Sequence, residues 1–235
     1  MRERVRHTST AVTAVTAVTR PGGAGRHAAG IAATMDDRGV RCARPWDGRI
    51  AIVVPTLGRA SFGELVRSLA EAPPDPRVQL DSVVVVDDRV SASVFERLEP
   101  SWVASAWLDG RGATIERRCS GGRGRAAARN IGIASTTTPW VVVLDDEVTV
   151  AHDWWGRLAD DVGEAGADVA AVVGGGVTAP DGSGDLALRR DALERGGLDH
   201  GRDLLGWLVD AGWRWTFGRR TVVSRSTPVR GIRTP

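Results

Sequence analysis

The sequence contains no lysine, only two cysteines and no long apolar run. All 31 basic residues are arginines, and they alternate with acidic residues rather than forming a stripe, so nucleic-acid binding is not expected. Cys42 and Cys119 have neither C-x-x-C nor metal-ligand spacing, which is typical of reduced thiols in a cytoplasmic protein. No run of 18 apolar residues is present, so no transmembrane segment is expected.

The two ends of the sequence differ in composition from its middle. Residues 1–47 contain Ala-Val-Thr repeats and a passage rich in Gly, Arg, Ala and His, without helix or strand periodicity. We predict a disordered extension there, and no signal peptide because no clear cleavage site follows. Residues 48–215 have the length and apolar content of one α/β domain, and residues 216–235 are predicted to be a poorly ordered tail.

The first half of this domain has the pattern of a strand–helix–strand unit. Residues 49–54 and 82–86 are β-branched apolar runs, as in buried strands. Between them, apolar residues at helical spacing predict a helix, with Ser61 and Glu64 spaced as a capping box at its start. Two strands joined by a helix form a parallel pair with a right-handed crossover.

The later elements follow from similar patterns. The Gly-rich stretch Gly121–Gly124 precedes an Ala-rich helix, and free N–H groups at such a helix start bind anions. The other predicted elements are short strands at 102–108 and 114–115, a buried strand at 141–144, a helix at 153–165, a strand at 169–173 and a short helix at 204–211.

Three consecutive acids, Asp145, Asp146 and Glu147, follow the apolar run Val141–Leu144 directly. In open α/β sheets, ligands bind at the carboxyl ends of strands. Adjacent carboxylates repel one another, so either water in a solvated loop or a hard divalent cation such as Mg²⁺ or Mn²⁺ must stabilise them. Because Pro55-Thr56 and Asp87-Asp88 also end predicted strands, polar groups are expected to gather along one edge of the sheet.

In their order and spacing, these stretches resemble nucleotide-sugar glycosyltransferases of family 2. The resemblance covers about residues 49–175 and is carried by Val53–Arg59, Val85–Asp88, Gly124–Gly132, which is close to the family's G-x-a-x-a-R-N-x-G, and Leu144–Glu147, which is close to its L-D-D-D. It implies the GT-A fold, a Rossmann-like sandwich with a mostly parallel central sheet.

The resemblance also implies roles for the matched residues. The substrate-binding residues would be Pro55, Thr56, Arg59, Asp87, Arg129, Asn130, Asp145 and Asp146. Asp87 would hydrogen-bond the nucleotide base, and Arg129 with Asn130 would line the nucleotide or diphosphate pocket. Asp145 and Glu147 would occupy the family's D-x-D positions and hold a divalent metal, Mg or Mn, on the diphosphate.

The C-terminal third departs from the family pattern. Gly196–Asp199 resembles the family's Gly-Gly-Phe-Asp-like turn, after which a Glu-Asp pair normally supplies the base that deprotonates the acceptor. His200–Leu204 contains no such pair. The base is therefore either missing or replaced by Asp203, our candidate catalytic residue.

Three functions are consistent with the sequence. The first is an inverting, metal-dependent glycosyltransferase acting on a nucleotide-sugar donor and a glycan, lipid or small-molecule acceptor. The second is a catalytically decayed relative that binds nucleotide. The third is a dinucleotide-dependent oxidoreductase, because Gly122–Ala127 reads G-x-G-x-x-A. The third ranks low, since that fingerprint should follow the first strand of the fold, whereas two predicted strands precede it.

Overall fold

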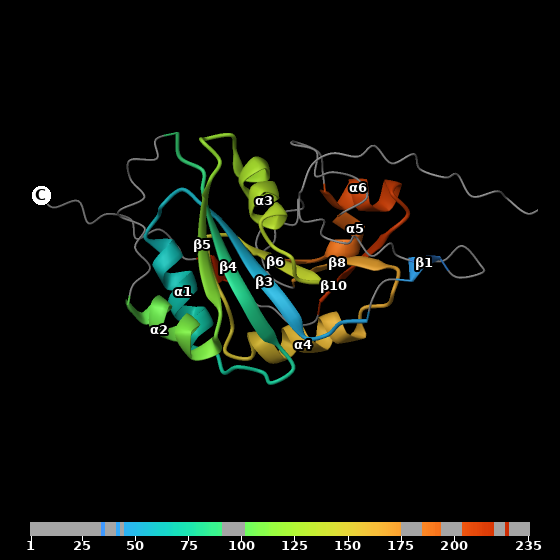
Figure 1. Cartoon of the computed structure of the whole chain (residues 1–235), viewed down its shortest axis with the longest axis horizontal. Coiled ribbons are helices and arrows are strands. Elements are labelled where there is room, and N and C mark those ends of the chain that lie inside the picture. Colours follow the sequence, from blue (N-terminus) through green and yellow to red (C-terminus); the bar gives the residue numbers. More distant parts are fainter. Residues whose placement is uncertain are drawn as a thin grey trace, which may run out of the picture. The chain divides into compact units, whose positions relative to one another are not determined.

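The computed structural model describes residues 34–35, 41–42, 45–90, 102–174, 185–193, 204–218 and 224–225. Their main feature is a seven-stranded sheet in the order β10-β8-β9-β6-β3-β4-β5 (Figure 1). Its strands are β3 (Arg49–Thr56), β4 (Gln79–Asp87), β5 (Thr114–Cys119), β6 (Trp140–Leu144), β8 (Val169–Val173), β9 (Asp185–Arg189) and β10 (Arg214–Phe217). Only β9 runs antiparallel to its neighbours, so the predicted mostly parallel sheet is confirmed.

Helices pack on both faces of this sheet. One face is covered by α1 (Ser61–Glu71), α2 (Trp102–Arg111) and α4 (Trp154–Glu164), and the other by α3 (Arg125–Ala134), α5 (Arg190–Leu193) and α6 (Leu204–Asp210). Successive strand residues point to opposite faces: Ile52 packs toward α1 and Val53 toward α3. Both side chains are fully buried, which explains why the strands read as unbroken apolar runs.

Two local predictions were wrong. Residues 102–108 are not a strand but the larger part of α2, which ends in a Schellman turn where Gly112 has φ +64° and the Ala113 N–H bonds the Leu108 carbonyl. The capping box does not form, because the helix begins at Ser61 itself with Ala60 at its N-cap and no side-chain cap. The Ser61 hydroxyl is buried without a hydrogen-bond partner in the described part of the chain.

Short strands also occur in the two terminal stretches. β1 (Thr34–Met35) pairs with β2 (Arg41–Cys42), and β11 (Ser224–Arg225) pairs with β7 (Val148–Thr149), which follows the three acids. β10 extends the sheet two residues beyond the expected domain end at residue 215. No helix in the described residues is long and apolar enough to cross a membrane.

Candidate active site

The strand register brings the predicted polar residues to one edge of the sheet. β3 lies between β4 and β6, with Thr56 opposite Asp87 and Val53 opposite Val143. The three strands are parallel, so their carboxyl ends lie side by side. The residues that follow them, including Asp145, therefore gather at this edge, as the sequence predicted.

Asp146 connects the ends of β6 and β3. Its Oδ2 accepts a 2.6 Å hydrogen bond from the Thr56 hydroxyl and a 3.2 Å bond from the Leu57 N–H. The Thr56 oxygen in turn accepts from the Gly58 N–H at 2.9 Å. Asp146 and Thr56 are 5% and 2% exposed, so these two predicted substrate-binding residues hold the β3 turn in place.

Each of the other two acids of the triplet is paired with an arginine. Asp145 Oδ2 lies 3.0 Å from Arg125 Nη1 at the start of α3, and Glu147 forms an ion pair with Arg59. The sequence offered water or a metal as the groups that stabilise these acids, and the structure adds a third, the guanidinium group. Arg125 was not among the predicted site residues, although it lies one turn before Arg129 on α3.

Asp87, the predicted base-binding residue, is fully buried and held by Arg89. Its Oδ1 accepts from the Arg89 backbone N–H at 2.9 Å and from Arg89 Nε at 2.8 Å, and its Oδ2 pairs with the same guanidinium. These bonds raise the pKa of Arg89. The sequence analysis missed Arg89, although its place two residues after Asp87 is a local signal.

Asp88 anchors the Gly-rich loop. Its Oδ1 accepts from the Gly124 N–H at 2.9 Å and from the Ser120 hydroxyl. Within this loop Gly122 has φ +73°, and a Cβ there would lie 2.7 Å from a methyl group of Val90. Because Asp88 accepts from the Gly124 N–H, one N–H of the predicted anion site is already bound by a side chain of the protein.

The R-N-x-G part of the motif lies on α3. Asn130 is buried and Arg129 is half-buried one turn from Arg125. A Cβ on Gly132 would lie 2.2 Å from Val53 Cγ1 on β3. The final glycine of the motif is thus required for close packing of α3 on the sheet.

Some predicted residues lie apart from this cluster. Pro55 is buried in β3 opposite Val86, with no polar side chain to offer. Asp203 lies outside the described residues. The G-x-G-x-x-A stretch follows β5, an edge strand and not the first strand of the sheet. Among the described residues, no group of three or more His, Cys, Asp and Glu side chains could hold a metal ion.

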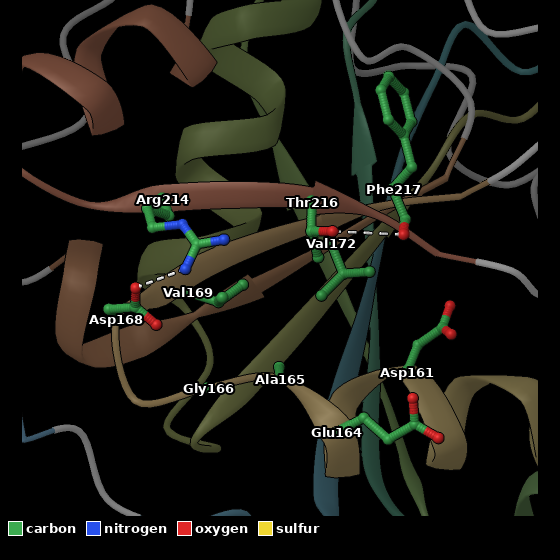
Figure 2. Close-up of a pocket in the computed structure, with 10 residues that line it drawn as sticks. All are labelled: Asp161, Glu164, Ala165, Gly166, Asp168, Val169, Val172, Arg214, Thr216 and Phe217. Atoms are coloured by element: carbon green, nitrogen blue, oxygen red, sulfur yellow. Dashed lines mark hydrogen bonds and ion pairs between the residues drawn. The ribbon is translucent and has the colours of Figure 1, made fainter.

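A cavity of about 390 Å³ lies elsewhere, between the C-terminal end of α4 and the β8–β10 edge (Figure 2). Its polar lining includes Asp161, Glu164 and Asp168, and Arg214 forms a 2.9 Å ion pair with Asp168. None of the paired acids and arginines at the carboxyl ends of β3, β4 and β6, which we call the acid and arginine cluster, lines this cavity. The cluster and this cavity are therefore separate features.

Comparison with known proteins identifies the family. The model of glycosyl transferase family 2 matches residues 51–225. The mannosyltransferase PcManGT from Pyrobaculum calidifontis, solved with GDP-Man and Mn²⁺, has a TM-score of 0.57 and 24% identity over 80% of this chain and 61% of its own. Staphylococcus aureus TarS 1-349, solved with UDP-GlcNAc, has a TM-score of 0.54 and 16% identity over 76% of this chain and 59% of its own.

These two similarities confirm the GT-A fold that the sequence predicted. The chain spans about three fifths of the length of both solved proteins. No curated protein sequence matches it. Because the family model covers most of the chain, its family is settled: the chain belongs to glycosyl transferase family 2.

Proposed function

We propose that the chain transfers a sugar from a nucleotide-diphosphate donor to an acceptor hydroxyl. One observation carries this proposal: at one sheet edge, three carboxylates are each paired with an arginine from another segment or the adjacent loop. The pairs are Asp87–Arg89, Asp145–Arg125 and Glu147–Arg59. A guanidinium group binds phosphate as well as carboxylate. A diphosphate can therefore bind the arginine in place of the carboxylate, and the carboxylate can then bind another part of the donor.

The positions of the pairs assign parts of the donor. Arg125 and Arg129 lie one turn apart on α3, which begins at the edge of the sheet, and would bind the diphosphate. Asp87 ends β4, which is separated from β6 by β3, and would hydrogen-bond the nucleotide base. The carboxylate of Asp145, which follows β6 and pairs with Arg125, is suited to the ribose or to a metal.

Asp145 and Glu147 fit a divalent metal, Mg²⁺ or Mn²⁺, of the kind that binds one or two carboxylates together with substrate phosphates and water. Both are carboxylates at the same strand end, and each is now paired with an arginine that can move to phosphate. A metal held there would neutralise the charge that develops on the leaving diphosphate. The solved structure of PcManGT contains Mn²⁺ and GDP-Man, which supports this part of the proposal.

The reaction would be a single displacement with inversion. The acceptor oxygen forms a bond to the anomeric carbon, the bond from that carbon to the diphosphate oxygen breaks, and the diphosphate leaves with the electron pair. The acceptor proton passes to a carboxylate, for which Asp203 remains our candidate. The acceptor is a glycan, a lipid or a small molecule.

A decayed relative that binds the donor without turnover is the second candidate, because no Glu-Asp pair follows Gly196–Asp199. The oxidoreductase hypothesis is abandoned. Its fingerprint follows an edge strand late in the fold, and the chain belongs to a transferase family.

Titration calorimetry tests the donor site. The full chain is titrated with UDP, GDP and NAD⁺, each with and without Mn²⁺. We expect metal-dependent binding of one nucleoside diphosphate and its loss in D145A and E147A. The matched control is D153A, which removes an exposed acid that pairs with Arg157 of α4. Metal-independent binding of NAD⁺ alone would contradict the proposal. Donor turnover in the wild type but not in D203N would then separate an active enzyme from a decayed one.

A further inference from the structure

Another buried carboxylate lies on β9, the strand next to β6. Asp185 is the first residue of β9 and is 1% exposed. In the antiparallel pair of β9 and β6 it lies opposite Leu144, the residue immediately before Asp145. Asp185 is therefore at the same edge of the sheet as the donor site, one strand further from β3, and its side chain lies on the face that α4 covers.

The hydrogen bonds of Asp185 are only half complete. Its Oδ2 accepts a 3.0 Å bond from the indole N–H of Trp154, a fully buried side chain at the start of α4. Its Oδ1 is equally enclosed but has no hydrogen-bond partner in the described part of the chain. A buried carboxylate oxygen without a donor is costly, and an asparagine would accept from Trp154 equally well. The carboxylate at Asp185 is thus explained by a donor group that the described part of the chain does not supply.

The order of the strands indicates which group this is. β4, β3, β6 and β9 are successive strands of the sheet, spaced about 4.8 Å apart. The proposed base contact, Asp87, ends β4, and Asp145, which is proposed to hold the metal on the diphosphate, follows β6. The next strand in this direction is β9, which begins at Asp185. The next part of a nucleotide sugar after the diphosphate is the sugar.

We propose that Asp185 Oδ1 accepts a hydrogen bond from a hydroxyl group of the transferred sugar. This inference rests on the proposed function and adds a residue that determines specificity. Hydrogen bonds to a charged acceptor are strong where water is excluded, and the bond from Trp154 fixes the plane of the carboxylate. Asp185 would therefore favour a nucleotide sugar over the bare nucleoside diphosphate.

The test compares wild type with D185N by calorimetry, in Mn²⁺, using UDP, GDP, GDP-mannose, UDP-N-acetylglucosamine and further UDP- and GDP-linked hexoses. For the sugar that binds wild type most tightly, we expect the Kd to rise about tenfold in D185N. The Kd of the corresponding nucleoside diphosphate should not change. The Tm of D185N should be equal to that of wild type or higher, because the amide still accepts from Trp154 and the uncompensated charge is gone.

The control is D168N, which removes an acid at the other end of the neighbouring strand β8, where it pairs with exposed Arg214; it should change neither Kd. An unchanged nucleotide-sugar Kd in D185N would overturn the inference, and so would a lower Tm, which would make the carboxylate structural. If UDP and GDP do not bind wild type at all, the proposed function and this inference both fail. If they bind but Asp185 affects no sugar, only the inference fails.

Discussion

Arginines in two regions of the molecule bind different partners. At the donor edge, Arg59, Arg89 and Arg125 each pair with a carboxylate. Where β9 passes into α5, Arg189 and Arg190 donate instead to backbone carbonyl oxygens. In a sequence with no lysine, the residue type alone does not distinguish binding from structure, but the partner does.

The second pair binds the ends of helices on opposite faces of the sheet. Arg189 donates to the carbonyl oxygen of Gly166, just after α4, at 3.1 Å and to that of Val169, the first residue of β8, at 2.9 Å, and it lies over the ring of Trp140. Arg190 donates to the carbonyl oxygen of Thr138 at 2.8 Å, just after α3. Arg189 ends β9 and Arg190 begins α5, and these two consecutive arginines reach segments on opposite faces of the sheet.

The two sets differ in what can replace their partners. A diphosphate offers the same kind of oxygen as a carboxylate, so an arginine at the donor edge can exchange one for the other. No ligand oxygen replaces the backbone carbonyls that the second set binds, so loss of such an arginine removes hydrogen bonds within the fold. Removing an arginine of the first set should therefore weaken ligand binding, and removing one of the second set should destabilise the fold.

The largest effect is expected for R189M. It leaves at least two carbonyls without this donor and removes a guanidinium whose pKa is lowered by burial. We expect the free energy of unfolding to fall by about 3 kcal/mol in urea titrations, with R189K intermediate. Nucleotide affinity at low temperature should persist. The control R214M removes an exposed arginine and should change stability by less than about 0.5 kcal/mol.

The next largest effect concerns ligand binding by an arginine at the donor edge. R125A should raise the Kd of the nucleoside diphosphate about tenfold in calorimetry, because one charge-assisted hydrogen bond is lost. Its Tm should stay within about 2 °C of wild type, since the side chain is more than half exposed. R157A, an exposed i,i+4 pair on α4, is the matched control. A large decrease in Tm for R125A would show that arginines at the donor edge stabilise the fold in the same way as those bound to backbone carbonyls.

The sequence predicted the scaffold of the site well, because its signals are local. The β-branched runs that end in acids, such as Val141–Leu144 before Asp145, specify both a buried strand and what stands at its carboxyl end. The glycines around Arg125 likewise marked a loop before a helix. These features depend on neighbouring residues and on the two-residue period of a strand.

The pairings that complete the site could not be predicted in the same way. Arg125 and Asp145 are 20 positions apart, and Arg59 and Glu147 are 88 apart, so only the fold brings them together. The unpaired oxygen of Asp185 depends on how β9 aligns with β6. Arg89 is the exception, because it follows Asp87 by two residues and its backbone N–H makes a local turn with that carboxylate.

A smaller effect is expected at Asp88, which shares the donor edge but binds a backbone N–H, like a helix cap. D88A removes the acceptor for the Gly124 N–H and for the Ser120 hydroxyl. The free energy of unfolding should fall by about 1 kcal/mol, as for loss of an N-cap. D88N keeps an acceptor oxygen and should recover most of this loss. If D88N fell as far as D88A, the charge rather than the hydrogen bond would be responsible.

The smallest effect concerns a carboxylate–arginine pair far from any ligand, Asp75 and Arg77. Hydrogen bonds from Arg77 lower the pKa of Asp75. Its folded pKa is thus below the unfolded value of about 3.9, so the stabilisation is complete above that pH and is lost as the pH falls through the folded pKa. D75N should lower the Tm by about 1 °C at pH 7, and the difference from wild type should vanish in acid. If D75N lowered the Tm by more than D88A does, carboxylate pairs would hold this fold together as firmly as hydrogen bonds to its backbone. The distinction between the two sets of arginines would then no longer predict function.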